Sequence, residues 1–171
     1  MLFYSIIPKP PLIQTSFNRI ARFGTLIGLF IGIFQSFIWL ILIQIGWPSE
    51  ACALCAIAGG AWITGGLHLD GLMDTADALG AGKEKRILAM KDSTIGASGI
   101  IAILIIILLQ IASTLKLEIF TPLALIYSNF WGRFSPLIAI NNFNYIHEKG
   151  SGSIHKKNWK GLKIEILPSL I

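Results

Sequence analysis

Long stretches without a charged residue constrain the fold of this chain most strongly. Residues 23–49, 51–69 and 93–115 contain no Asp, Glu, Lys or Arg, and residues 119–146 contain only Arg133. A helix needs roughly 20 apolar residues to cross a bilayer. The sequence therefore predicts an all-α, polytopic membrane protein with about four transmembrane helices, of which the second is short and rich in glycine.

The basic residues alternate with these runs in a way that predicts topology. Of the 14 Lys and Arg residues, all but Lys116 and Arg133 fall on one side if the chain crosses four times. Basic residues concentrate in cytoplasmic loops, so we expect the N-terminus and the aspartate-rich loop to face the cytoplasm. Topology accounts for the basic loops without a nucleic-acid partner. The predicted location is the plasma (inner) membrane of a bacterium, with the lipid bilayer as a partner.

One membrane domain over residues 1–171 is the expected organisation. Residues 1–22 form a cytoplasmic N-terminal segment, and residues 23–146 hold the membrane helices. A cytoplasmic site loop covers residues 70–92 and includes a short helix at the membrane interface. Residues 147–171 form a basic tail, whose final "GLKIEILPSLI" is typical of the start of another span.

Small residues predict close helix packing. Gly24, Gly28 and Gly32 form a small-xxx-small row in the first span, which lets another helix approach closely. Cys52 and Cys55 form a CxxC pair. Redox or zinc chemistry at such a pair needs a second ligand pair or a thioredoxin-like context, and neither is present. We interpret both cysteines as small, buried helix residues.

Aspartate is confined to one neighbourhood of the chain. Asp70, Asp74 and Asp77 lie within "GGLHLDGLMDTADALG", and Asp92 follows shortly after. On a helix the first three share a stripe roughly 60° wide, where like charges repel. A divalent cation would relieve that repulsion, and Mg²⁺ is commonly held by one or two carboxylates together with substrate phosphates. The alternative is a solvated acidic turn in which Asp70 or Asp74 caps a helix.

The residues around the aspartates favour phosphate chemistry. Lys91 and Ser93 lie beside Thr94 and Gly96 at the start of the third span, where free helix N–H groups can bind an anion. Arg133 interrupts an apolar run, and an intramembrane arginine is by default a functional-site hypothesis. A bidentate phosphate contact is a natural role for it, and snorkelling or helix pairing is the alternative.

His68 is a candidate whose role depends on the local backbone. It lies about 160° from Asp70 on an ideal helix, so it shares a face with the carboxylates only if the helix breaks. Gly65, Gly66 and Gly71 make such a break possible. The other two histidines, in the basic tail, are interpreted as surface residues.

Two long motifs carry a family resemblance. "GGLHLDGLMDTADALGAG" followed by "RILAMKDSTIGASGIIA" resembles the signature of the cobalamin synthase family, also called adenosylcobinamide-GDP ribazoletransferases. The likeness runs from about residue 3 to about residue 153. It implies a Mg²⁺-dependent membrane enzyme of cobalamin biosynthesis. Such an enzyme joins α-ribazole, or its 5′-phosphate, to adenosylcobinamide-GDP and releases GMP, which completes the nucleotide loop.

The resemblance also implies roles for single residues. Matched to the family motifs, the acidic segment supplies the metal ligands, and the later motif and the fourth span supply substrate contacts. The implied assignments are metal binding for Asp70, Asp74 and Asp77, catalysis for His68 and Asp92, and substrate binding for Lys91, Ser93 and Arg133.

This sequence departs from the family pattern in two places. Ala78 replaces a frequent glycine, and the family continues through what looks like two or three more membrane helices. The resemblance therefore implies either a truncated chain or one that needs a partner, as a homo-oligomer or with a complementing chain.

Two other functions are compatible with acidic residues in a membrane bundle. CDP-alcohol phosphatidyltransferases also use a D-G-x-x motif and a divalent metal, but their pattern continues with Ala-Arg and a distant G-x-x-x-D-x-x-x-D. This chain lacks that continuation after Asp77. A cation transporter component would carry its carboxylates at mid-span, whereas these lie at a helix end beside lysines.

Overall fold

The computed structural model describes residues 19–145 and 151–170, and the elements in these ranges are all helices. The predicted all-α class is therefore confirmed for the described part of the chain. Five longer helices are α1 (Gly24–Gln44), α2 (Ser49–Ile63), α3 (Leu67–Gly80), α5 (Ala97–Leu117) and α6 (Thr121–Asn142). Shorter elements are α4 (Arg86–Ala89), α7 (Ser151–Lys157), α8 (Leu162–Glu165) and the 3-10 helices η1 (Ile20–Phe23), η2 (Glu118–Phe120) and η3 (Leu167–Leu170).

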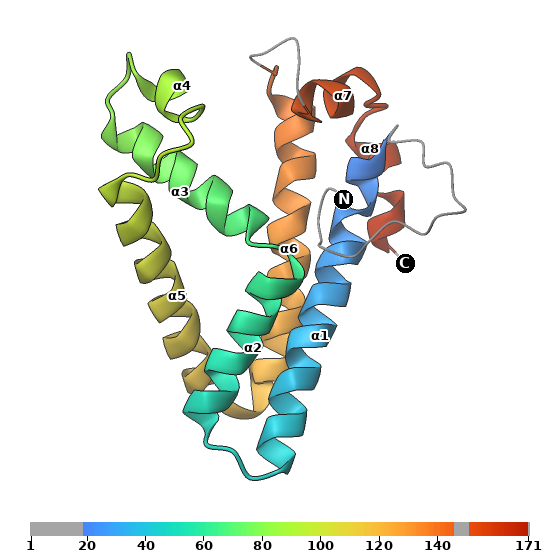
Figure 1. Ribbon diagram of the computed structural model, residues 1–171. Helices are drawn as coiled ribbons and strands as arrows, with labels where there is room; N and C mark the ends of the chain where they lie inside the picture. The colour runs from blue at the N-terminus through green and yellow to red at the C-terminus, as the bar shows by residue number, and fades with distance from the viewer. Residues whose placement is uncertain (1–18, 146–150, 171) are drawn as a thin grey trace, which may run out of the picture.

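Several of these helices are long and apolar enough to cross a membrane. Within the described residues, two stretches pass by length and composition, Ile20–Gln44 and Ala97–Asn142, and the pair α2–α3 adds a third if it counts as one span. The second stretch contains both α5 and α6. In Figure 1, α5 descends to η2 and α6 rises from it, so the chain runs in opposite directions along the two helices. The protein is thus a helical membrane protein.

A sharp bend separates α2 from α3. The two helices meet at 88°, and Gly65 and Gly66 between them have φ values of 62° and 70°. Glycine adopts this left-handed region without a steric penalty. A break therefore occurs at Gly65 and Gly66, before His68. Since α3 continues from His68 through Gly71 without interruption, the break that would place His68 on the face of the carboxylates does not occur. Because of the bend, the acidic segment lies across one end of the bundle instead of prolonging the second span (Figure 1).

Close packing of α1 against α6 forms the centre of the bundle. A Cβ atom at Gly32 would lie 2.6 Å from the Ile126 Cα, and one at Gly28 would lie 2.9 Å from the Arg133 Cγ. The predicted small-residue row is confirmed as a helix–helix contact. Next to it, α2 contributes Cys52, which is 0% exposed, to the buried core. Both cysteines are free thiols, Cys52 buried and Cys55 partly buried.

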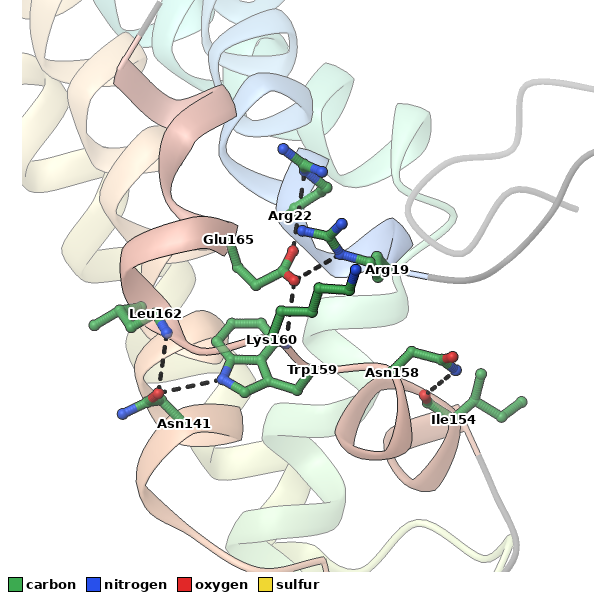
Figure 2. Close-up of polar contacts among 9 residues, drawn as sticks. All are labelled: Arg19, Arg22, Asn141, Ile154, Asn158, Trp159, Lys160, Leu162 and Glu165. Carbon is green, nitrogen blue, oxygen red and sulfur yellow. Dashed lines mark hydrogen bonds and ion pairs between the residues drawn. The ribbon is translucent and has the colours of Figure 1, made fainter.

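The C-terminal residues pack against the start of α1 and the end of α6 (Figure 2). Glu165 is 1% exposed. Its carboxylate accepts a hydrogen bond from the Arg19 Nε at 2.7 Å and lies 3.9 Å from the Arg22 Nε. Nearby, the Asn141 Oδ1 accepts a hydrogen bond from the Trp159 Nε1 at 3.2 Å. These contacts hold residues 151–170 at the same end of the bundle as α3, in short helices.

One tail residue differs from its predicted environment. The sequence interpretation placed His155 at the surface, but its side chain is 9% exposed, and burial lowers its pKa. The prediction for His155 was wrong because the docking of α7 and α8 onto the bundle was not visible in the sequence. His147, and the N-terminal segment up to residue 18, lie outside the described residues.

Candidate functional site

The acidic helix α3 presents two carboxylates that are not engaged by the rest of the chain. Asp70 is exposed and Asp74 is half-buried. Neither carboxylate makes a hydrogen bond or an ion pair with another residue that the structure describes. Within residues 19–145 and 151–170, no three His, Cys, Asp or Glu side chains converge as a metal-ligand group. Asp70 and Asp74 are therefore available to a ligand from outside the chain.

Asp77, the third member of the acidic row, has a different environment. Its Oδ2 accepts a hydrogen bond from the Gly96 N–H, and its Oδ1 accepts one from the Gly99 N–H, both at 2.8 Å. Both donors belong to the first turn of α5. A side chain of the protein itself thus provides the anion at the start of α5. The sequence had instead suggested that these N–H groups bind a phosphate.

The second motif lies in the exposed loop between α4 and α5. Lys91, Asp92 and Ser93 are exposed, and no hydrogen bond or ion pair connects them with the acidic side chains of α3 in the described structure. The Asp92 Oδ1 accepts a hydrogen bond from the Thr94 N–H at 3.0 Å. This bond, together with the Thr94 hydroxyl, lowers the pKa of Asp92. A lowered pKa makes Asp92 a weaker proton acceptor.

Arg133 and His68 are brought together from distant parts of the chain. Arg133 lies in the middle of α6 and His68 in the first turn of α3, and the Arg133 Nη2 is 3.3 Å from the His68 Nδ1. Since guanidinium N–H groups only donate, Nδ1 is the acceptor and the ring proton lies on Nε2. On α3, His68 lies about 160° from Asp70, so it faces Arg133 from the side opposite the carboxylates.

This pair lines a cavity of about 560 Å³, most of whose lining comes from α2, α5 and α6. Most of its walls are apolar, and its polar lining includes Gln35, Asn129, His68 and Arg133. The Asn129 Nδ2 donates to the Gln35 Oε1 at 2.6 Å, and the Gln35 Nε2 donates to the Ala56 carbonyl at 3.0 Å. Gln35 and Asn129 thus form a hydrogen-bonded polar part of the lining, and Asn129 lies one helical turn from Arg133.

Sequence reasoning did not identify Gln35 and Asn129 as site residues. A signal was present, because each is an amide side chain inside an apolar run, where polar groups must find a partner. Their partners could not be foreseen. Gly60 leaves the room for the Gln35 side chain, since a Cβ there would lie 2.6 Å from the Gln35 Cδ.

The side chains of this region can bind a cation, bind a phosphate and exchange a proton. Two hard oxygen donors on α3 can bind a divalent cation, and a guanidinium can bind a phosphate. The neighbouring imidazole can exchange a proton. The carboxylates lie on α3, which crosses one end of the bundle (Figure 1), and Arg133 reaches the His68 ring from the middle of α6.

Comparison with known proteins identifies the family of this chain. The model of the family described as cobalamin-5-phosphate synthase matches residues 1–171. A protein of Prochlorococcus marinus, named adenosylcobinamide-GDP ribazoletransferase, is 51% identical over 98% of this chain and 65% of its own length. A Trichormus variabilis protein of the same name is 34% identical over 99% of this chain and 68% of its own length.

The chain spans about two thirds of the length of the curated relatives that it matches. No solved structure matches it. The family match nevertheless covers the whole sequence, including both motifs and the arginine of α6. The chain therefore belongs to the cobalamin-5-phosphate synthase family.

Proposed function

We propose that this chain catalyses the reaction named for its relatives, the transfer of a ribazole to adenosylcobinamide-GDP. A hydroxyl oxygen of α-ribazole, or of its 5′-phosphate, attacks the phosphorus attached to cobinamide. The bond from that phosphorus to the GMP oxygen breaks, GMP leaves, and the hydroxyl proton passes to a base. The observation that carries this proposal is the pair Asp70 and Asp74, two carboxylates without a partner in the described part of the chain, on a helix that leads into a basic loop.

Magnesium is the cofactor that suits these carboxylates. Asp70 and Asp74 offer only oxygen donors, which Mg²⁺ prefers, and substrate phosphates can complete its coordination. When bound there, Mg²⁺ would supply positive charge at the pyrophosphate. Asp70 and Asp74 would hold the cation in the first two turns of α3, and Lys91 and Ser93 would contact the substrate from the loop that adjoins the other end of this helix.

Arg133 is the proposed phosphate ligand inside the bundle. Its guanidinium is half-buried, adjoins His68 and lines the cavity. A guanidinium can contact a phosphate through two parallel N–H groups, which fixes orientation as well as charge. We assign binding of the diphosphate of the nucleotide substrate to this residue.

His68 is the better candidate for the proton acceptor. It lies 3.3 Å from the proposed phosphate ligand Arg133 and lines the cavity, whereas Asp92 lies in the exposed loop and contacts neither of them in the described structure. The His68 Nδ1 accepts a hydrogen bond from Arg133. When Arg133 turns to a phosphate, that nitrogen is freed to accept the hydroxyl proton. Phosphate binding and base activation are coupled in this arrangement.

The orientation in the membrane follows from the placement of charge. Figure 1 places η1, α4, α7 and α8 at the same end of the bundle as α3. These elements and the adjoining loops carry most of the basic residues, and the opposite end carries Lys116. By the positive-inside rule, the site faces the cytoplasm. Soluble substrates made in the cytoplasm would then reach α3 directly.

A direct assay tests the proposed function. Membranes that contain this chain should release GMP from adenosylcobinamide-GDP when α-ribazole and Mg²⁺ are present. Omission of α-ribazole is the matched control, because hydrolysis alone would release nucleotide without it. GMP release that does not depend on α-ribazole would contradict the transferase assignment.

A further inference from the structure

The three aspartates of α3 have the same spacing but not the same surroundings. The carboxylates of Asp70 and Asp74 make no hydrogen bond or ion pair with the rest of the described chain. Both oxygens of Asp77, in contrast, are engaged by backbone N–H groups of Gly96 and Gly99 at 2.8 Å. Asp77 is therefore the one member of the row whose carboxylate already has a binding partner inside the described structure.

The partner of Asp77 is the N-terminus of a long helix. Gly96 is the N-cap of α5, and Gly99 lies in its first turn. The first N–H groups of a helix have no partner within the helix, and the helix dipole favours a negative charge beside them. No side chain of α5 itself caps this end. Asp77 does so from α3, so the cap also joins two helices.

The contact between α3 and α5 at this junction leaves no room for a side chain at the glycines of both motifs. A Cβ atom at Gly96 would lie 2.8 Å from the Asp77 Cγ, and one at Gly99 would lie 3.2 Å from the same atom. On the other side, a Cβ at Gly80 would lie 2.7 Å from the Ser98 Oγ. Any larger residue would push the carboxylate off the amides. The small residues in "GASG" (96–99) and "DALG" (77–80) thus allow α3 and α5 to approach closely enough for the Asp77 hydrogen bonds.

We propose that Asp77 is a positioning residue that ties the second motif to the acidic helix, and that it is not a ligand of the divalent cation. This inference rests on the proposed function, and it divides the acidic row into two cation ligands and one structural carboxylate. A cation at Asp77 would have to compete with two amide donors that have no other partner. The same junction closes the α5 N-terminus to substrate phosphate, which leaves Arg133 and the loop residues to bind it.

The position of the loop residues follows from this junction. Lys91 and Ser93 lie a few residues before Gly96, at the end of the segment that Asp77 holds. With the tie broken, α5 can move away from α3 and take these residues with it. Loss of Asp77 should therefore lower the maximal rate and leave the cation requirement unchanged.

Amide hydrogen exchange of the purified protein in detergent tests the tie without any need for activity. Asp77→Ala removes both acceptors, and Asp77→Asn retains one carbonyl oxygen. Asp70→Asn is the matched control, since it makes the same chemical change on the same helix. We expect exchange in residues 96–99 to accelerate about tenfold in Asp77→Ala and less in Asp77→Asn. The exchange rate in Asp70→Asn should equal that of the parent.

A magnesium titration of GMP release tests the division of roles. Asp70→Asn should raise the Mg²⁺ concentration for half-maximal rate about tenfold, whereas Asp77→Asn should lower the maximal rate at an unchanged Mg²⁺ requirement. Unchanged exchange in Asp77→Ala, or a raised Mg²⁺ requirement in Asp77→Asn, would overturn the inference. If the parent itself released no GMP, the proposed function would fail, while the exchange result would still confirm or refute the tie.

Discussion

Replacement of Gly32 by alanine should force α1 away from α6. The added Cβ would lie 2.6 Å from the Ile126 Cα and 2.7 Å from the Leu125 carbonyl oxygen. Both are backbone atoms, which cannot rotate out of the way as a flexible side chain can. Overpacking of this kind costs about 1–3 kcal/mol. Alanine also favours a helix over glycine by about 0.5–1 kcal/mol, which offsets part of that cost.

Gly132→Ala on α6 is the matched control for this effect. No atom lies within 4 Å of a Cβ at Gly132. This variant therefore has the stabilisation that alanine gives a helix, without the steric clash. The difference between the two variants then isolates the clash. For a chain of this size it corresponds to about 2–12 °C in melting temperature. Thermal unfolding in detergent measures it, and equal melting temperatures for both variants would refute the packing argument.

Three further results are expected. Arg133→Leu should insert into the membrane as well as the parent but bind the nucleotide substrate about 10–100-fold more weakly, with partial recovery in Arg133→Lys. Titration of both variants with the nucleotide substrate checks this, and unchanged affinity in Arg133→Leu would contradict a phosphate contact. Glu165→Gln should lower stability by about 1–3 kcal/mol because it leaves two arginines without their buried acid, whereas Glu50→Gln at an exposed site should melt like the parent. Single cysteines at Ser49 and Lys85, in a background without the native cysteines, should label from opposite sides of the membrane, and labelling from the same side would contradict the proposed orientation.

Much of the fold was predictable because it follows from local chemistry. The uncharged runs located α1, α5 and α6, and the glycine row of the first span identified the face that packs on α6. The break before α3 was also predictable, since Gly65 and Gly66 favour it. The right-angle direction of the bend was not, because it depends on how α3 packs against α5. The burial of Glu165 and His155 depends on contacts between distant segments and gave no local signal.

For the candidate site, the sequence indicated the residues but not their contacts. The acidic row and the intramembrane arginine stood out because charge is costly in such a chain. Their partners did not, since the sequence could not indicate that Arg133 reaches His68 or that Asp77 reaches Gly96 and Gly99. Helical periodicity placed the three aspartates on one stripe. It could not show that the end of this stripe lies against the N-terminus of α5.

The effect of Asp74→Asn on Mg²⁺-dependent GMP release tests the account most directly. The substitution keeps the shape of the side chain and removes its charge, on a carboxylate that makes no bond within the described structure. Immunoblotting of washed membranes controls for the amount of inserted protein. The account predicts normal insertion and loss of GMP release at every Mg²⁺ concentration. Near-normal turnover in this variant would contradict the assignment of the acidic helix as the cation site.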